Sequence, residues 1–175
     1  MSTPKAHCQR ISLCVALLSA LIATTSPAEP KQGTGMNNDD HSQAAFDVLA
    51  AAVARNDIGR LEVVWLPASI LTRSAMTPHR LEASFRYKIV ARDMSTGLLR
   101  KELAQVLSSV KVYRETRMAD LRWGVIFFGR NGERVGAVYV AKNGEQGAVN
   151  DIPCRLEGGL LGWLRGIFKG LDQFN

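Results

Sequence analysis

The sequence contains little cysteine and histidine, and it has no long apolar segment. Only three cysteines and three histidines occur among its 175 residues, which leaves few ligands for a metal cluster and few partners for disulfides. The longest largely apolar stretch, residues 11–23, has 13 residues, whereas a membrane-spanning helix needs about 20. No run of five or more like charges occurs, so the clustered basic stripe of a nucleic-acid-binding protein is missing. These absences disfavour metalloproteins, disulfide scaffolds, membrane-spanning proteins and nucleic-acid-binding proteins.

The first 28 residues have the layout of a secretory signal peptide. Lys5 and Arg10 precede the apolar stretch, and small residues follow it up to Ala28, which matches the order of a signal's basic, apolar and cleavage regions. We expect cleavage after Ala28, with Ala23 as the alternative. No cysteine follows the small residues, so a lipoprotein is not expected. The segment predicts an exported protein, located in the bacterial periplasm or outside the cell.

The remainder of the chain has the size of one domain. Removal of residues 1–28 leaves 147 residues, with 20 Lys and Arg against 16 Asp and Glu and a formal charge of +4. Basic and acidic residues alternate along the sequence, which is typical of a solvated surface. We predict a flexible leader over residues 29–39, because this segment is polar and has no hydrophobic periodicity. A single domain is predicted over residues 40–175.

Cys154 is the only cysteine beyond the predicted signal peptide. An intramolecular disulfide is therefore excluded for the mature chain. The residue could be a buried small side chain, a free thiol or half of an intermolecular bridge. Its neighbours Ile152, Pro153 and Leu156 favour burial.

Periodicity predicts alternating helices and strands in the first half of the domain. A helix is expected to begin at Asp40, because Asp40 and Gln43 have the spacing of a capping box, and to end at Asn56. Thr77 followed by Pro78 predicts a second helix start. The other predicted elements are a strand over 61–66, a ten-residue loop over 67–76, a strand over 86–92, a helix over 97–108 and a strand over 110–114.

The strongest local signal is a β-hairpin in the second half. Two segments rich in β-branched and aromatic residues, 121–128 and 134–140, flank the dipeptide Asn131-Gly132. This dipeptide predicts a type I′ turn, in which both central residues have positive φ. A second such dipeptide, Asn143-Gly144, leads to a short strand over 147–149. These strands predict an antiparallel β-meander.

Together the elements predict an α+β fold. We expect a single antiparallel sheet of four to six strands, ending in the C-terminal β-meander, with two main helices packed on it and a C-terminal Gly-rich helix. The alternation predicts one buried side of the hairpin, formed by Leu121, Trp123, Val125 and Phe127. We place Ile126, Phe128, Val138 and Val140 on the opposite side, covered by the C-terminal helix or by a partner such as a second copy in a homodimer.

Glycine recurs every four residues near the C-terminus, at positions 158, 162, 166 and 170. Three interpretations are open. The helix could dock on the sheet, with glycine permitting close approach. It could lie at a membrane surface, or it could contact another helix through its small residues. The side chains expected to make the membrane or helix contact are Trp163, Leu164, Ile167 and Phe168.

The sequence carries no recognisable catalytic, metal-binding or cofactor-binding motif. His41 and His79 stand 38 positions apart, and no G-x-S-x-G nucleophile motif occurs. A pair of Cys154 and His79 is disfavoured by the packing role expected for the cysteine. We interpret Asp120 with Arg122 as a surface ion pair at the start of a strand. An enzyme is therefore disfavoured, and no catalytic residue, metal ligand or cofactor is predicted.

Elimination leaves protein binding as the expected role. Rigid loops and tight hairpins are suitable mounts for residues that dock into another protein. We expect an exported inhibitor or immunity-type protein that restrains an envelope-directed enzyme or toxin. The alternatives are an envelope protein held at the membrane surface by its C-terminal helix, and a cryptic hydrolase. The candidate partner-binding residues are Arg73, Arg130, Asn131, Glu133, Asn143, Glu145 and Gln146.

Overall fold

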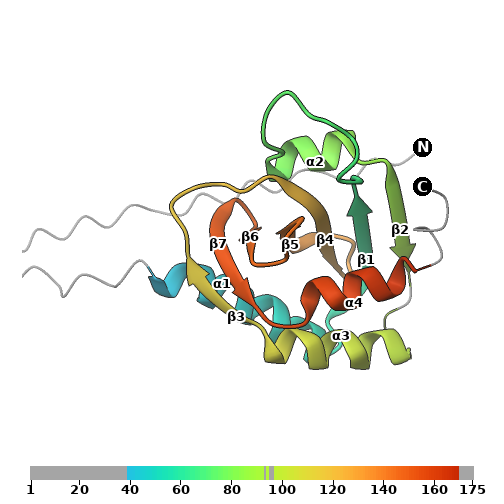
Figure 1. The fold of residues 1–175 in the computed structure, drawn as a ribbon. Coiled ribbons are helices and arrows are strands. Elements are labelled where there is room, and N and C mark those ends of the chain that lie inside the picture. Colours follow the sequence, from blue (N-terminus) through green and yellow to red (C-terminus); the bar gives the residue numbers. More distant parts are fainter. Residues whose placement is uncertain (1–38, 93, 95–96, 170–175) are drawn as a thin grey trace, which may run out of the picture. The chain divides into compact units, whose positions relative to one another are not determined.

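The structure, a computed structural model, describes residues 39–92, 94 and 97–169. The predicted signal peptide, all but the last residue of the predicted leader, and Gly170 lie outside the described residues. The described part is an α+β fold with one antiparallel sheet, as the sequence predicts (Figure 1). None of its helices is both long enough and apolar enough to cross a membrane.

The described residues form four helices and seven strands, one strand more than the upper limit expected. The sheet has the strand order β2-β1-β4-β5-β6-β7-β3. In sequence, the elements are α1 (Asp39–Ala54), β1 (Ile58–Trp65), α2 (Pro78–Ser84), β2 (Tyr87–Ala91), α3 (Leu98–Ser109), β3 (Lys111–Arg114), β4 (Leu121–Gly129), β5 (Arg134–Ala141), β6 (Gln146–Val149), β7 (Ile152–Glu157) and α4 (Leu160–Ile167).

Strand β7 is the element that the sequence did not predict. It lies between β6 and β3, and its second residue is Pro153. Proline has no N–H for a sheet ladder and usually argues against an inner strand. The β3–β7 ladder begins at Cys154, which pairs with Arg114, and Pro153 comes one position before it. Proline therefore occupies the end of the β3–β7 ladder, where its missing donor is tolerated.

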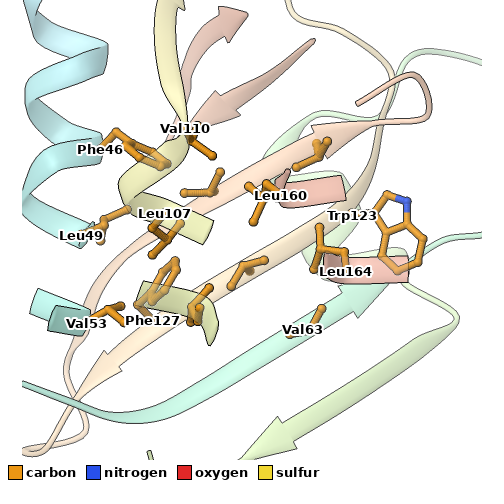
Figure 2. Close-up of a cluster of buried hydrophobic side chains, with 14 of the residues drawn as sticks. Phe46, Leu49, Val53, Val63, Leu107, Val110, Trp123, Phe127, Leu160 and Leu164 are labelled. Carbon is orange, nitrogen blue, oxygen red and sulfur yellow. The ribbon is translucent and has the colours of Figure 1, made fainter. Parts of the chain in front are cut away.

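Helices α1, α3 and α4 pack against one face of the sheet and enclose the larger core. Figure 2 shows Phe46 and Leu49 of α1, Leu107 of α3 and Leu164 of α4 among the strand side chains. Cys154 is buried in the same core, as predicted. Burial of a leucine or phenylalanine side chain contributes about 1.5–3 kcal/mol. Most of the buried side chains lie in this core, so this face accounts for most of the domain's hydrophobic stabilisation.

The second face of the sheet is covered by α2 and by the end of the loop before it. Leu81 of α2 and Met76 pack there on Val64, Ile126 and Tyr139, all buried. The expectation that the C-terminal helix covers this face is wrong, because α4 lies on the opposite face. The homodimer contact stays a prediction.

Three side chains of the hairpin lie on the side opposite to the one predicted. Val138 and Val140 belong to the larger core, because they are in register with Val125 and Trp123 and cross-strand neighbours share a face. Leu121 lies on the second face. A β-bulge between Leu121 and Trp123 shifts the alternation by one residue.

Both predicted hairpins are present, but their turns differ from type I′. The positive φ angles are on Gly132 (83°) and Gly144 (82°), and among the described non-glycine residues only Asn56 and Asn150 have positive φ. The Gly132 N–H donates to the Gly129 carbonyl oxygen at 3.0 Å. This is the pattern of a three-residue loop, in which glycine follows an ordinary turn and forms a bulge.

Helix α4 docks on the sheet through its bulky residues and not through its glycines. Phe168, directly after α4, makes edge contacts with the stacked indole rings of Trp65 and Trp123, at centroid distances of 5.8 and 5.3 Å. Gly162 and Gly166 are exposed, and an added Cβ at either would meet nothing within 4 Å. The interpretation that the helix docks on the sheet is therefore correct, but a close approach through Gly162 and Gly166 is wrong.

Candidate functional site

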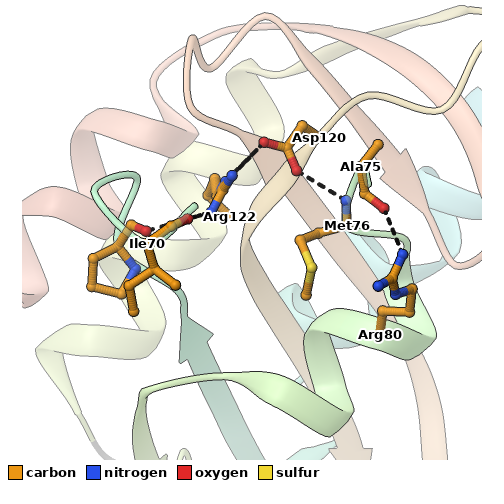
Figure 3. A network of polar contacts seen from close by, with 7 residues as sticks. Ile70, Ala75, Met76, Arg80, Asp120 and Arg122 are labelled. Carbon is orange, nitrogen blue, oxygen red and sulfur yellow. Dashed lines mark hydrogen bonds and ion pairs between the residues drawn. The ribbon is translucent and has the colours of Figure 1, made fainter. Parts of the chain in front are cut away.

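A buried arginine holds the loop between β1 and α2. The side chain of Arg122 is 8% exposed and forms an ion pair with Asp120 at 2.6 Å. It also donates to the carbonyl oxygens of Pro67 at 3.4 Å and Ile70 at 2.9 Å (Figure 3). The β-bulge lies at Arg122, since Leu121 and Trp123 pair with the consecutive residues 141 and 140. Bulges re-aim side chains, and this one directs an arginine to the loop.

The other end of the loop is fixed by the same carboxylate and by α2. The second oxygen of Asp120 accepts a hydrogen bond from the Met76 N–H at 2.9 Å. Arg80 of α2 donates to the Ser74 hydroxyl. It also donates to the Ala75 carbonyl oxygen at 3.5 Å (Figure 3). We call residues 67–76 the clamped loop, because side chains from two other elements hold its main chain.

The clamped loop presents an apolar tip. Leu71 is 94% exposed and Ile70 is 38% exposed, while Arg73 is exposed two residues further on. A single exposed leucine on a protein surface needs no explanation. On a loop already held in one conformation, however, it can be buried by a partner with little further loss of chain entropy. This loop is therefore the best-prepared contact surface among the described residues.

A cavity of about 150 Å³ lies beside the clamped loop. The stacked indoles of Trp65 and Trp123 form part of its lining, with ring centroids 4.9 Å apart. The rest of the lining comes from Ala68, Arg122, Lys142 and Arg165. A neighbouring hollow of about 390 Å³ shares Lys142 and Arg165, and its lining also includes Asp120, Ala141, Asn143 and Gln146. The surface beside the loop is thus cationic with an aromatic wall.

The structure divides the predicted partner-binding residues between two ends of the sheet. Arg73 lies on the clamped loop. At the same end of the sheet, where Leu121 pairs with Ala141, Asn143 and Glu145 lie in the β5–β6 turn and Gln146 is the first residue of β6. The remaining three, Arg130, Asn131 and Glu133, lie in the β4–β5 turn at the opposite end of the same hairpin. The predicted residues therefore do not form a single surface.

The polar side chains of both turns are partly occupied in holding the turns themselves. Asn131 donates to the Glu133 carboxylate at 2.7 Å and accepts from the Glu133 N–H at 3.1 Å. Asn143 accepts from the N–H groups of Glu145 at 3.2 Å and Gln146 at 3.4 Å. Arg130 donates to the Asn56 carbonyl oxygen at 3.0 Å. These contacts give the residues a structural role that their sequence pattern did not reveal.

The four side chains predicted to make a membrane or helix contact lie against the core of their own chain. Leu164 and Phe168 are 0% exposed and belong to the core. Trp163 and Ile167 are partly buried against the same core. The apolar side of α4 is occupied by the sheet of its own chain, so these four side chains do not form a free surface in this conformation.

A second polar cavity, of about 410 Å³, lies between α2 and β5. Its lining includes Glu82, which forms two hydrogen bonds with Arg134 at 2.9 Å and one with the Tyr139 hydroxyl. Burial acts to raise the pKa of Glu82, but the hydrogen bonds from Arg134 and Tyr139 and the Arg134 charge outweigh it and lower the pKa. Burial, followed by the hydrogen bond to Glu82, raises the pKa of Tyr139. The three side chains form a satisfied network with no group poised to accept a proton.

The cysteine and the histidines of the described residues do not form a catalytic or metal-binding arrangement. Burial is the main cause that raises the pKa of the Cys154 thiol to about 12, so the thiolate required of a nucleophile is scarce at neutral pH. Within residues 39–92, 94 and 97–169, no group of three or more His, Cys, Asp or Glu side chains could hold a metal ion. His41 and His79 are both exposed.

The sequence interpretation missed the role of Arg122, which it placed in a surface ion pair. One signal was present: Arg122 lies inside a run of buried strand residues, directly before Trp123. An arginine in such a run requires several acceptors, because a buried guanidinium without partners is costly. The cations Lys142 and Arg165 had no comparable signal, since only the fold brings them together.

Comparisons with protein-family models, with curated proteins and with solved structures found nothing that matches this chain.

Proposed function

We propose that this protein is an exported protein-binding domain that docks on its partner through the clamped loop. We further propose that it acts as an inhibitor or immunity-type protein, which restrains an envelope-directed enzyme or toxin. The observation that carries the proposal is the 94% exposure of Leu71 on a loop whose main chain is held by Asp120 and Arg122.

A clamped loop loses less chain entropy on binding than a free loop does. Fixing the backbone of one residue costs about 1–2 kcal/mol, so ordering a free ten-residue loop on binding would offset most of the contact energy. In this chain the loop is already ordered on folding, because Arg122 of β4 and Arg80 of α2 hold its main chain. Burial of Leu71 by a partner would then contribute about 1.5–3 kcal/mol. Almost all of this free energy would appear as binding affinity, because little chain entropy remains to be lost.

The inhibitor or immunity role is supported by the predicted export and by the placement of the apolar tip. A rigid loop with an apolar tip can fill a partner's cleft without changing shape. The Leu71 side chain would enter such a cleft, and the cationic surface beside the loop would contact its rim. The predicted signal peptide would bring the domain to the compartment where envelope-directed enzymes and toxins act.

The test is partner capture with a matched pair of leucine variants. The full sequence is expressed in its host with a C-terminal tag, and the exported protein is used to capture proteins from an envelope extract. Leu71→Ser removes the apolar tip of the loop. Leu98→Ser makes the same change at a residue of α3 that is 78% exposed and away from the loop.

We expect one stoichiometric partner to be captured by the wild type and by Leu98→Ser, but not by Leu71→Ser. With the purified partner, Leu71→Ser should raise the Kd by roughly 10- to 100-fold, as the loss of about 1.5–3 kcal/mol requires. Equal binding by Leu71→Ser and wild type would refute docking through the loop. The inhibitor or immunity role is refuted if complex formation leaves the partner's activity unchanged.

A further inference from the structure

The cavity beside the clamped loop has an unbalanced charge. Its three charged lining residues, Arg122, Lys142 and Arg165, are all cations. Arg122 is paired with Asp120. Over the part of the chain that the structure describes, no acidic side chain lies within ion-pair distance of Lys142 or Arg165. The cavity therefore has two cations available for an external anion.

The three cations come from different parts of the fold. Arg122 is at the start of β4, Lys142 directly follows β5, and Arg165 is on α4, from which it donates to the Lys142 carbonyl oxygen at 3.5 Å. Charge-assisted hydrogen bonds from such groups to a carboxylate are about twice as strong as neutral ones. The indoles of Trp65 and Trp123 add an apolar wall that suits a methylene group. The cavity thus fits a carboxylate on a short aliphatic stem.

We infer that this cavity receives an aspartate or glutamate side chain of the protein that docks on the clamped loop. The inference rests on the proposed function, whose partner it describes in chemical terms. Ala68 of the clamped loop lines the cavity, so one partner surface can reach both the cavity and the loop. The loop itself contains Arg73 and no acidic residue, so its charge also favours an acidic partner.

The charge of Asp120 favours a carboxylate over a phosphate group. Its carboxylate pairs with Arg122 and lines the neighbouring hollow. A doubly charged phosphate placed beside Arg122 would be repelled by this carboxylate more strongly than a singly charged carboxylate would. The partner segment is therefore expected to carry an acidic side chain beside the apolar pocket that takes Leu71.

The test is an NMR titration with small probes of defined charge. N-acetyl-glutamate α-amide carries one side-chain carboxylate, and N-acetyl-glutamine α-amide is its neutral isostere. The indole N–H signals of Trp65 and Trp123 report on the cavity, and that of Trp163 serves as the internal reference. We expect saturable shifts at Trp65 and Trp123 with the glutamate probe alone, with a Kd on the order of millimolar, as befits a single small group.

Three glutamine variants locate the site. Lys142→Gln and Arg165→Gln should each weaken binding of the glutamate probe about fivefold, since a partly exposed charge pair contributes up to about 1 kcal/mol. Lys169→Gln removes an exposed cation that does not line the cavity, and it should leave the Kd unchanged. The overall spectra of the three variants should match that of the wild type, which confirms that their folds are intact.

Several results would overturn the inference. It fails if neither probe shifts the two indoles, if the glutamine probe binds equally well, or if Lys142→Gln and Arg165→Gln bind like the wild type. Tighter binding of inorganic phosphate than of the glutamate probe would instead indicate a phosphate-binding site. These results leave the loop proposal standing if the captured partner still depends on Leu71. Conversely, probe binding without any Leu71-dependent partner would refute docking on the loop but retain the carboxylate site.

Discussion

Replacement of Arg122 by methionine tests whether this side chain holds the clamped loop in place. Methionine keeps an aliphatic chain in the buried position but cannot donate to the carbonyl oxygens of Pro67 and Ile70. A hydrogen bond from a charged donor contributes about 1.5–3 kcal/mol. The contact with Ile70 is well formed at 2.9 Å and the contact with Pro67 is long at 3.4 Å, so we count one bond. The loop should then open about 2 kcal/mol more easily, which raises its open population roughly 30-fold.

The global cost should be smaller than for a fully buried ion pair. Removing one partner of such a pair costs about 3–5 kcal/mol, because the other charge is left without compensation. Here the Asp120 side chain is 44% exposed and can be hydrated when Arg122 is lost. The main effect of Arg122→Met is therefore expected in the loop and not in the whole domain.

Limited trypsin digestion separates these two effects. Arg73 is exposed on the loop, and cleavage after it requires the loop to open locally. Lys101 lies inside α3, and cleavage there requires the helix to unfold. The ratio of the two cleavage rates should rise roughly 10- to 30-fold in Arg122→Met, in proportion to the open population of the loop.

The control is Arg155→Met, which removes an exposed ion pair with Glu157. Such pairs contribute at most about 1 kcal/mol, and this one is remote from the loop, so the ratio of cleavage rates should not change. An unchanged ratio in Arg122→Met would refute the clamp. Equal acceleration at Arg73 and Lys101 would show that Arg122 stabilises the whole domain and not the loop.

Three further predictions concern the core and α4. Because burial raises the pKa of Cys154 to about 12, its thiol should react with dithionitrobenzoate only after urea is added. Cys154→Ala identifies the signal of this thiol, and reaction in the native state would contradict the prediction. Burial also raises the pKa of Tyr139, so the folded state keeps its phenol protonated when the unfolded chain ionises above about pH 10. The unfolding free energy of the wild type should therefore decrease toward that of Tyr139→Phe as the pH rises above about 10 in urea titrations, and a constant difference would refute the assignment. Combined Gly162→Ala and Gly166→Ala substitutions should raise the unfolding free energy by about 1–2 kcal/mol, whereas Gly147→Ala should lower it, because its Cβ would meet the Tyr139 carbonyl oxygen. No gain from the α4 substitutions would show that the glycines serve another purpose.

Local signals in the sequence were sufficient for most of the elements. The Thr77 side chain caps α2 by accepting from the Arg80 N–H at 3.4 Å, and Pro78 opens that helix as predicted. The hairpin of β4 and β5 follows from two β-rich segments around a glycine turn. These features depend on residues that are close in sequence, and so they can be recognised without the fold.

Features that depend on register could not be predicted. The face of Val138 is decided by which residue of β4 lies opposite it, and the face of Leu121 is decided by the bulge at Arg122. On α4, glycine and leucine both recur at helical spacing, so the pattern alone does not decide which side faces the sheet. The larger apolar area of Leu164 and its neighbours decides it, because burial of that area is more favourable than close approach at glycine.

The residues of the candidate site were harder to predict than the secondary structure, because only the fold brings them together. The turn residues were correctly identified as turns, but their side chains are largely used to hold those turns. The residues of the cationic cavity come from positions 65, 122, 142 and 165, which no local motif connects. The loop over residues 67–76 could be predicted, because its length and its position after Pro67 are visible in the sequence.

The clamp acts on main-chain atoms of the loop, and this has a consequence for how the sequence can change. Arg122 binds carbonyl oxygens, and Asp120 binds an N–H, so neither requires a particular side chain at its point of contact. Residues 68–73 can accordingly diversify by mutation while the loop keeps its shape. A lineage of such proteins could acquire new targets by altering a few loop codons, with no change to the sheet that supports them. For the protein engineer, the same arrangement offers a site where foreign recognition sequences can be grafted between two fixed ends.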